Sequence, residues 1–255
     1  MTIFALDSIR NAVVEPGMEP LLESVRADVA ASRWKEDAHV GDLSDVLDAF
    51  DVSRPRLNVI ASMLSDLGGK HGADISTGLG FVPVVLRRLG LNLVATEHDR
   101  EMGLLARTGG EILPYSIGVS PPPIRAGSLD FLVFSEVLEH LNLSPVRVVA
   151  ELASLLTDGG RFILTTPNIA RLQHIELLAA GENFLEPFDE DFPTDRPATD
   201  FIEHVREYSV REVVEAVEAA GLGVDQVVMT GWGDGGYSSV PNPYANEIIV
   251  LQATK

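Results

Sequence analysis

A short glycine-bearing turn at residues 73–80 constrains the fold of this chain more than any other feature. It reads Ala-Asp-Ile-Ser-Thr-Gly-Leu-Gly and lies between a predicted strand and a helix that begins near Pro83. Glycine lets the backbone come close to a ligand, and the free N–H groups at a helix start face that ligand. The turn therefore predicts a nucleotide-like cofactor held at the end of a strand in an α/β sheet.

After Gly72, segments with strand patterns alternate with segments with helix patterns. Strands are predicted over 73–75, 91–96, 129–134, 161–166, 224–230 and 246–252, and helices over 83–89, 100–107, 145–157 and 209–220. Ser209 and Glu212 form the capping-box pattern that opens the last of these helices. This alternation predicts a doubly wound, mostly parallel sheet that ends in a strand pair. Ligands of such sheets bind beyond the carboxyl ends of the strands.

The first seventy residues show a different pattern, which is helical. Apolar residues recur with helical spacing over 21–29 and over 57–67, and the glycine pair Gly68-Gly69 marks a stop. We therefore expect an N-terminal helical cap over residues 1–70 and an α/β domain over residues 71–255.

Composition and charge exclude several classes of partner. The chain has 255 residues, a formal net charge of −19 at pH 7 and no cysteine. Nucleic acids and anionic lipid surfaces attract clustered Lys and Arg, so we expect neither as a partner. Without cysteine there is no disulfide, thiolate nucleophile or thiolate metal site. The sequence shows no secretory signal and no apolar run of membrane-spanning length, so we expect a cytoplasmic protein. We expect a small molecule as the substrate, and a homodimer is a possible assembly.

Two residues narrow the class of cofactor. The dinucleotide fingerprint Gly-x-Gly-x-x-Gly needs a glycine where the chain has Pro83, which disfavours a nicotinamide-dependent oxidoreductase. Glu97 comes about 20 positions after Gly78, where an acidic residue accepts hydrogen bonds from ribose hydroxyls. On these residues alone, an ordinary strand-to-helix turn followed by a solvated carboxylate remains an alternative.

The segment 129–141 carries the most specific pattern, Leu-Asp-Phe-Leu-Val-Phe-Ser-Glu-Val-Leu-Glu-His-Leu. It resembles the strand-four segment of class I S-adenosylmethionine-dependent methyltransferases. The turn at 73–80 resembles motif I of the same family, with Ser76 in place of the first glycine. The resemblance covers about residues 55–255, and segment 166–222 is similar to methyltransferases found with glycan and natural-product pathways.

The resemblance implies a Rossmann-like, seven-stranded sheet with an antiparallel terminal strand. It implies S-adenosyl-L-methionine as the cofactor, and methyl transfer to an oxygen or nitrogen atom of a sugar or natural-product scaffold. Residues 169–205 would then form a lid-like insertion over the substrate. The cofactor would be bound by Asp74, Ser76, Thr77, Gly78, Gly80, Glu97, His98, Ile117, Ser135 and Glu136, with Ile117 offering backbone groups to the adenine.

Glu136, Glu139 and His140 stand at helical spacing i, i+3, i+4. If the segment is a helix, one face carries two carboxylates and an imidazole. Similar residues hold magnesium in metal-dependent small-RNA methyltransferases, with His204 as a fourth candidate here. Many metal-free relatives keep the same string, so we expect no metal. We interpret Glu139, His140 and His204 as the catalytic candidates, with His140 as the base.

Two departures from the family pattern support a rival interpretation. Ser76 replaces a glycine, and the segment 115–123 lacks the acidic residue that usually receives the adenine amino group. The rival is a catalytically inactive, methyltransferase-like protein that serves as a binding or partner subunit. Metal-assisted methylation is a further alternative.

Overall fold

The computed structural model describes residues 8–13, 15–31, 42–98, 112–185, 204–232 and 242–255. An eight-stranded sheet runs through its centre in the order β1-β7-β8-β6-β5-β2-β3-β4. Only β8 runs antiparallel to its two neighbours, β6 and β7. The strands are β1 (Arg10–Asn11), β2 (His71–Ile75), β3 (Asn92–Glu97), β4 (Ile112–Pro114), β5 (Leu129–Ser135), β6 (Leu156–Pro167), β7 (Gly223–Thr230) and β8 (Ile248–Thr254).

The predicted doubly wound, mostly parallel sheet with an antiparallel terminal strand is confirmed, with one strand more than expected. The additional strand is β1, which pairs in parallel with β7 at the edge of the sheet. It has only two residues, Arg10 and Asn11, so it carries no apolar alternation that a sequence pattern would reveal.

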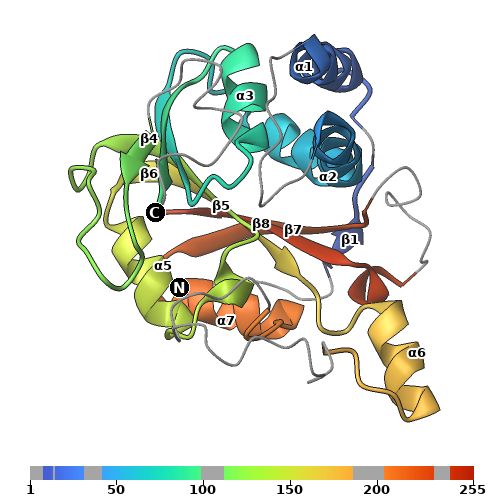
Figure 1. Ribbon diagram of the computed structural model, residues 1–255. Helices are drawn as coiled ribbons and strands as arrows, with labels where there is room; N and C mark the ends of the chain where they lie inside the picture. Colours follow the sequence, from blue (N-terminus) through green and yellow to red (C-terminus); the bar gives the residue numbers. More distant parts are fainter. Residues whose placement is uncertain (1–7, 14, 32–41, 99–111, 186–203, 233–241) are drawn as a thin grey trace.

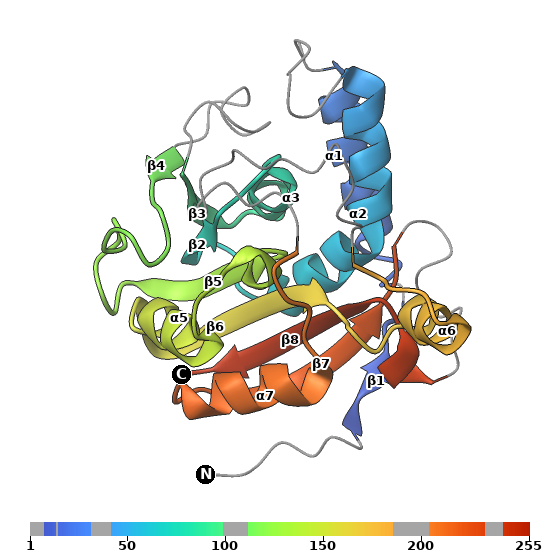
Figure 2. The same cartoon turned by 60° about the horizontal axis from the view of Figure 1, so that its bottom comes forward.

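Helices cover both faces of the sheet (Figure 1). On one face lie α1 (Glu19–Ala31), α2 (Leu43–Leu64) and α3 (Phe81–Arg88). On the other face lie α5 (Pro145–Ala153) and α7 (Val210–Ala219), side by side in both views (Figure 2). The short helix α6 (Leu172–Ala180) lies away from the sheet (Figure 1). Of two 3₁₀ turns, η2 (Leu138–His140) follows β5 and η3 (Pro243–Ala245) precedes β8.

The N-terminal helices pack on the sheet and share its core. Phe50 of α2 meets Phe81 of α3 edge to face, with ring centroids 5.3 Å apart. Phe131 and Ile163, from the central strands, are buried in the same apolar cluster. Residues 42–64 are therefore part of the layer that covers one face of the sheet. The division into residues 1–70 and 71–255 stays a prediction.

Helix α2 is much longer than the predicted segment 57–67. It begins at a capping box in which Asp42 accepts hydrogen bonds from Ser44 N and Asp45 N. Pro55 lies inside it, which a sequence pattern treats as a break, because proline removes one backbone donor. Helix α6 was not predicted at all, and the helix predicted over 100–107 lies outside the described residues. Within those residues, no helix is long and apolar enough to cross a membrane.

Candidate active site

The glycine turn lies where the sequence predicts it, between β2 and α3, and its backbone is left-handed at three positions. Gly78 and Gly80 have φ of 53° and 80°, and Ser76 has φ of 58°. Ser76 therefore adopts a backbone conformation that favours glycine, at a cost of about 1–2 kcal/mol for a residue with a Cβ. The end of β3 holds the turn, because Ser76 N donates to Thr96 Oγ1 (3.2 Å) and Thr77 N to Thr96 O (2.9 Å).

Glu97 is buried at the end of β3, and its carboxylate faces the turn. Oε2 accepts a hydrogen bond from Gly78 N at 2.8 Å. Oε1 accepts from His98 N at 2.8 Å and lies 2.7 Å from His98 Nδ1. A carboxylate has about four acceptor positions, so it still has capacity for ribose hydroxyls. The His98 side chain is 67% exposed and borders this carboxylate.

Asp74 is a buried acid directly behind the turn. Its Oδ2 has no hydrogen-bond partner among the described residues. Burial, helped by the nearby charge of Glu97, raises the pKa of Asp74 from 3.8 to about 7. The buried hydroxyl of Thr77 lies close to Asp74 and opposes this rise, but its geometry does not make it a hydrogen-bond partner of Oδ2. Unpartnered buried polar atoms of this kind suit a ligand that supplies the missing donors and acceptors.

The next strand of the sheet, β5, brings Ser135 and Glu136 to the same edge. Glu136 has a φ of 55° and its N–H donates to Thr165 O at 3.0 Å. Its Oε1 accepts from Thr165 Oγ1 (2.7 Å), and Ser135 Oγ lies 2.8 Å from that hydroxyl. Its Oε2 lies 3.0 Å from Nη1 of Arg56, which comes from α2. No sequence pattern pointed to Arg56.

The predicted helical face of Glu136, Glu139 and His140 is wrong. Only Leu138–His140 are helical, as a 3₁₀ turn, and Glu136 precedes that turn in a left-handed conformation. Glu136 interacts with Arg56 and Thr165. Glu139 instead accepts a hydrogen bond from Thr166 Oγ1 at 3.0 Å. The three side chains share no helix face.

Glu139 is 1% exposed, and its Oε1 has no hydrogen bond within the described part of the chain. Burial, together with the charge of Glu136, raises the pKa of Glu139 well above its ordinary value. Oε1 lies 3.8 Å from His140 Nε2. Burial therefore favours the neutral form of this carboxyl group over the ionised form.

His204 is brought to this place from far along the chain. Val205 N and Arg206 N donate to Glu139 O, at 2.8 and 3.1 Å. The rings of His140 and His204 meet edge to face with centroids 5.1 Å apart. Glu139, His140 and His204 each offer an atom within 4.8 Å of the others, a spacing that a metal ion would fit. The structure thus unites the three catalytic candidates, through backbone contacts that the sequence did not reveal.

The adenine side of the site is described only in part. Ile117 lies in the loop after β4 and packs partly buried against the core. Tyr115 N donates to Glu97 O at 2.9 Å, which holds this loop beside β3. Residues 99–111 lie outside the described residues, as do residues 186–203 of the predicted lid over 169–205.

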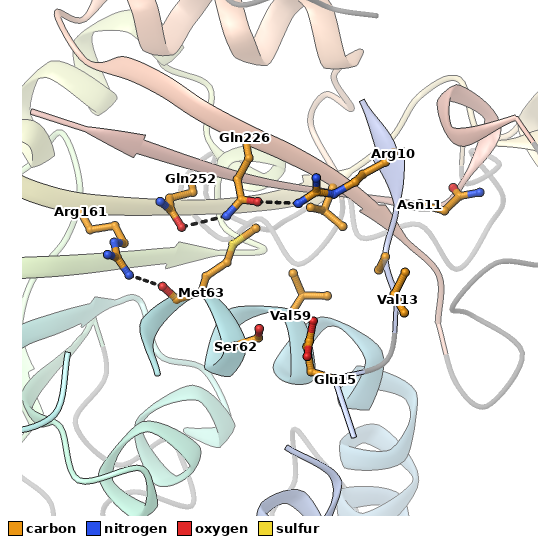
Figure 3. Close-up of a pocket in the computed structure, with 12 residues that line it drawn as sticks. Arg10, Asn11, Val13, Glu15, Val59, Ser62, Met63, Arg161, Gln226 and Gln252 are labelled. Carbon is orange, nitrogen blue, oxygen red and sulfur yellow. Dashed lines mark hydrogen bonds between the residues drawn. The ribbon is translucent and has the colours of Figure 1, made fainter. Parts of the chain in front are cut away.

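Two open cavities lie away from the glycine turn. The cavity in Figure 3, of about 440 Å³, lies between α2 and the sheet, where Arg10, Gln226 and Gln252 form a hydrogen-bonded row. Its Arg161 precedes Thr165 by four residues on β6, about 13 Å at the rise of a strand. A second cavity, of about 680 Å³, is lined by Leu141, Tyr208 and Glu212, among others. No residue of the glycine turn lines either one.

Glycine turn, strand-end carboxylate and mixed sheet together define a class I S-adenosylmethionine-dependent methyltransferase fold. A family model described as a methyltransferase domain matches residues 57–227, and the chain belongs to that family. This family assignment rules out the alternative of a nicotinamide-dependent oxidoreductase.

Curated relatives agree with this assignment, and solved structures share the fold. The ubiquinone biosynthesis O-methyltransferase of Xanthomonas oryzae pv. oryzae is 28% identical over 119 residues, which are 44% of this chain and 49% of that protein. The chain thus spans about half the length of the curated relatives it matches. A Mesorhizobium loti S-adenosylmethionine-dependent methyltransferase superposes with TM-score 0.55 at 17% identity, over 80% of this chain and 98% of that one. The [4+2]-cyclase SpnF superposes with TM-score 0.53 at 14% identity, over 94% of both chains.

Proposed function

We propose that this chain transfers the methyl group of S-adenosyl-L-methionine to an oxygen or nitrogen atom of a small molecule, a sugar or a natural-product scaffold. One observation carries the proposal: the cofactor-side residues and the acid–base group meet at the carboxyl ends of neighbouring strands. In register, Ile75 of β2 pairs with Thr96 of β3, and Ser135 of β5 pairs with Thr165 of β6.

The proposed methyl transfer needs a methyl donor, an acceptor atom and one protein base. The acceptor atom attacks the sulfonium methyl carbon, the carbon–sulfur bond breaks, and the sulfonium becomes a neutral thioether. The acceptor's proton passes to an imidazole, His140 or His204, which becomes imidazolium. Glu139, buried beside His140, favours that charge when ionised. The protein's main contribution is to hold methyl donor and acceptor in line.

The substrate class rests on the chemistry of the chain and on its relatives. A net charge of −19 is unsuited to a nucleic-acid substrate. The relative from Xanthomonas oryzae is named for ubiquinone biosynthesis, and a structural neighbour from Streptomyces coelicolor (TM-score 0.51, 14% identity) is a geranyl diphosphate C-methyltransferase, so both act on small molecules. The cytoplasmic location and the homodimer stay predictions.

Calorimetric titration tests the cofactor half of this proposal. We expect S-adenosylhomocysteine and S-adenosylmethionine to bind the wild type, and Glu97→Ala to weaken binding more than tenfold. Asp158→Ala, which changes an exposed carboxylate far from the turn, serves as the control and keeps wild-type affinity. Absence of binding up to millimolar ligand would overturn the proposal.

One structural observation supports the alternative of a catalytically inactive binding protein: the strained backbone of Ser76 in the glycine turn. SpnF also shows that this fold is found in a protein named as a cyclase. A panel of sugars and aromatic natural products, incubated with cofactor and screened for a mass gain of one methyl group, separates the two. Tight cofactor binding without any methylated product across the panel favours the binding role.

A further inference from the structure

A buried carboxylate, Glu207, joins three basic side chains beside the proposed site. Its side chain is 3% exposed. Oε1 accepts from Arg171 Nη2 at 3.0 Å and lies 3.0 Å from His204 Nδ1. Oε2 lies 3.4 Å from His174 Nδ1. Within the described residues Glu207 therefore forms the centre of a charged cluster that reaches His204.

Glu207 is held in its ionised form. Burial alone would raise the pKa of its carboxyl, but the hydrogen bond from His204 and the charge of Arg171 outweigh burial and lower it. An ionised carboxylate only accepts hydrogen bonds. His204 Nδ1 must therefore carry the hydrogen, and in the neutral ring Nε2 keeps its lone pair.

The rest of the cluster fixes Glu207 in place. Arg171 is 8% exposed, and its guanidinium stacks 5.0 Å from the centre of the Trp232 ring. His174 stacks on Phe184 with ring centroids 4.0 Å apart, and its Nδ1 lies 3.2 Å from Ile169 O. Burial lowers the pKa of His174, so this ring is neutral and Arg171 is the cation that balances Glu207.

Nδ1 and Nε2 lie on opposite sides of an imidazole ring, so the contact with Glu207 directs His204 Nε2 away from the cluster. The other neighbours of His204 are His140, ring to ring, and Glu139, whose carbonyl accepts from the two residues after His204. The proposed reaction requires the methyl acceptor on that side.

We infer that Glu207 is a positioning residue for His204: it sets the Nδ1–H tautomer and leaves Nε2 as the base that takes the acceptor's proton. The inference rests on the proposed methyl transfer. It makes His204 the base of the proposed step, since Glu207 Oε1 lies 3.0 Å from its Nδ1. Arg171 acts through Glu207, as the charge that keeps it ionised.

Nitrogen-15 NMR of the histidine rings tests this in cofactor-free protein, so its outcome does not depend on turnover. The chain has six histidines, and the His204→Asn variant identifies the His204 signals. We expect Nδ1–H in the wild type, and a shift of the population toward Nε2–H in Glu207→Met. Glu212→Gln, on the same segment and with the cap of α7 kept, is the control and leaves the tautomer unchanged. Where Glu207→Met fails to fold by circular dichroism, Arg171→Met/Glu207→Met removes both charges and takes its place.

Turnover provides the second readout. In Glu207→Met we expect kcat to fall at least 100-fold, in the range that general base catalysis contributes, while cofactor affinity stays within twofold of wild type. An Nε2–H tautomer in the wild type, or an unchanged tautomer in the methionine variant, overturns the inference. A wild-type protein with the expected tautomer but no methyl transfer refutes the proposed function and leaves the positioning of His204 intact.

Discussion

Arg56, in the middle of α2, forms an ion pair with Glu136 at the carboxyl end of β5, with Nη1 3.0 Å from Oε2. The two side chains are 14% and 18% exposed. The charge of Arg56 also lowers the pKa of Asp74 and of Glu139, against the larger effect of burial. A residue of the N-terminal segment thus offsets the negative charge of three acids in the proposed site.

Replacing Arg56 by Met should destabilise the protein and raise the pKa of Glu139 further. A largely buried partner left unpaired costs on the order of 2–3 kcal/mol here, somewhat below the value for a fully buried pair. Denaturant unfolding measures the loss. Arg26→Gln is the matched control: it breaks the Arg26–Asp51 pair, whose side chains are 36% and 35% exposed, and should cost at most about 1 kcal/mol. Equal losses in both variants would contradict the special role of Arg56.

Replacing Ser76 by Gly should stabilise the cofactor-free protein. Glycine adopts the left-handed backbone of this position without the Cβ penalty, although it also makes the unfolded chain more flexible. We expect a net gain of up to about 1 kcal/mol, or a rise in Tm of about 2–4 °C. Ser76→Ala keeps the Cβ and should show no gain in the same thermal scan. A lower Tm for the glycine variant would show that the hydroxyl contributes more than the strain costs.

The raised pKa of Asp74 predicts a specific dependence of stability on pH. Between about pH 4 and 7 the folded protein keeps a proton on Asp74 that the unfolded chain has lost, so stability falls as pH rises through this window. Asp74→Asn lacks this loss. Its free energy of unfolding should gain on that of the wild type by up to about 1.4 kcal/mol per pH unit from pH 5 to 7, and level off above pH 8.

Asp130→Asn serves as the opposite case for the same titration series. Hydrogen bonds from His71 N and Lys70 lower the pKa of Asp130, so its stabilisation is present above about pH 4 and is lost at more acid pH. The asparagine variant should therefore differ in slope from the wild type only below pH 4. Parallel curves for Asp74→Asn and the wild type from pH 5 to 7 would refute the raised pKa of Asp74.

Chelation should leave cofactor binding and turnover unchanged. Two of the three atoms that meet at Glu139, His140 and His204 are imidazole nitrogens, whereas Mg²⁺ and Ca²⁺ prefer oxygen ligands. Metal analysis of the purified protein and assays with and without EDTA measure this, with Glu139→Ala assayed beside the wild type. Activity that disappears in EDTA and returns with a divalent ion would establish metal-assisted methylation, and imidazole ligands would then favour zinc or iron over magnesium.

Much of the fold follows from local patterns along the chain. The strand predicted over 129–134 is β5, Leu129–Ser135, and the capping box of Ser209 and Glu212 opens α7. Such segments are predictable because burial on a parallel sheet and helix capping leave marks within a few residues. The two-residue strand β1 and the exposed helix α6, of which only His174 is buried, carry no such mark.

What the sequence by itself determined is the alternation of strands and helices, the turn at residues 73–80, and the place of Glu97 at the end of a strand. These are local or evenly spaced, so spacing alone reveals them. Only the tertiary structure decided that Arg56 forms an ion pair with Glu136, and that Glu136 and Glu139 have different partners. It also decided that Glu207 contacts His204 and that the charge of Arg171 compensates the charge of Glu207. Those contacts join segments far apart in the chain, and they depend on backbone hydrogen bonds and burial that no residue spacing encodes.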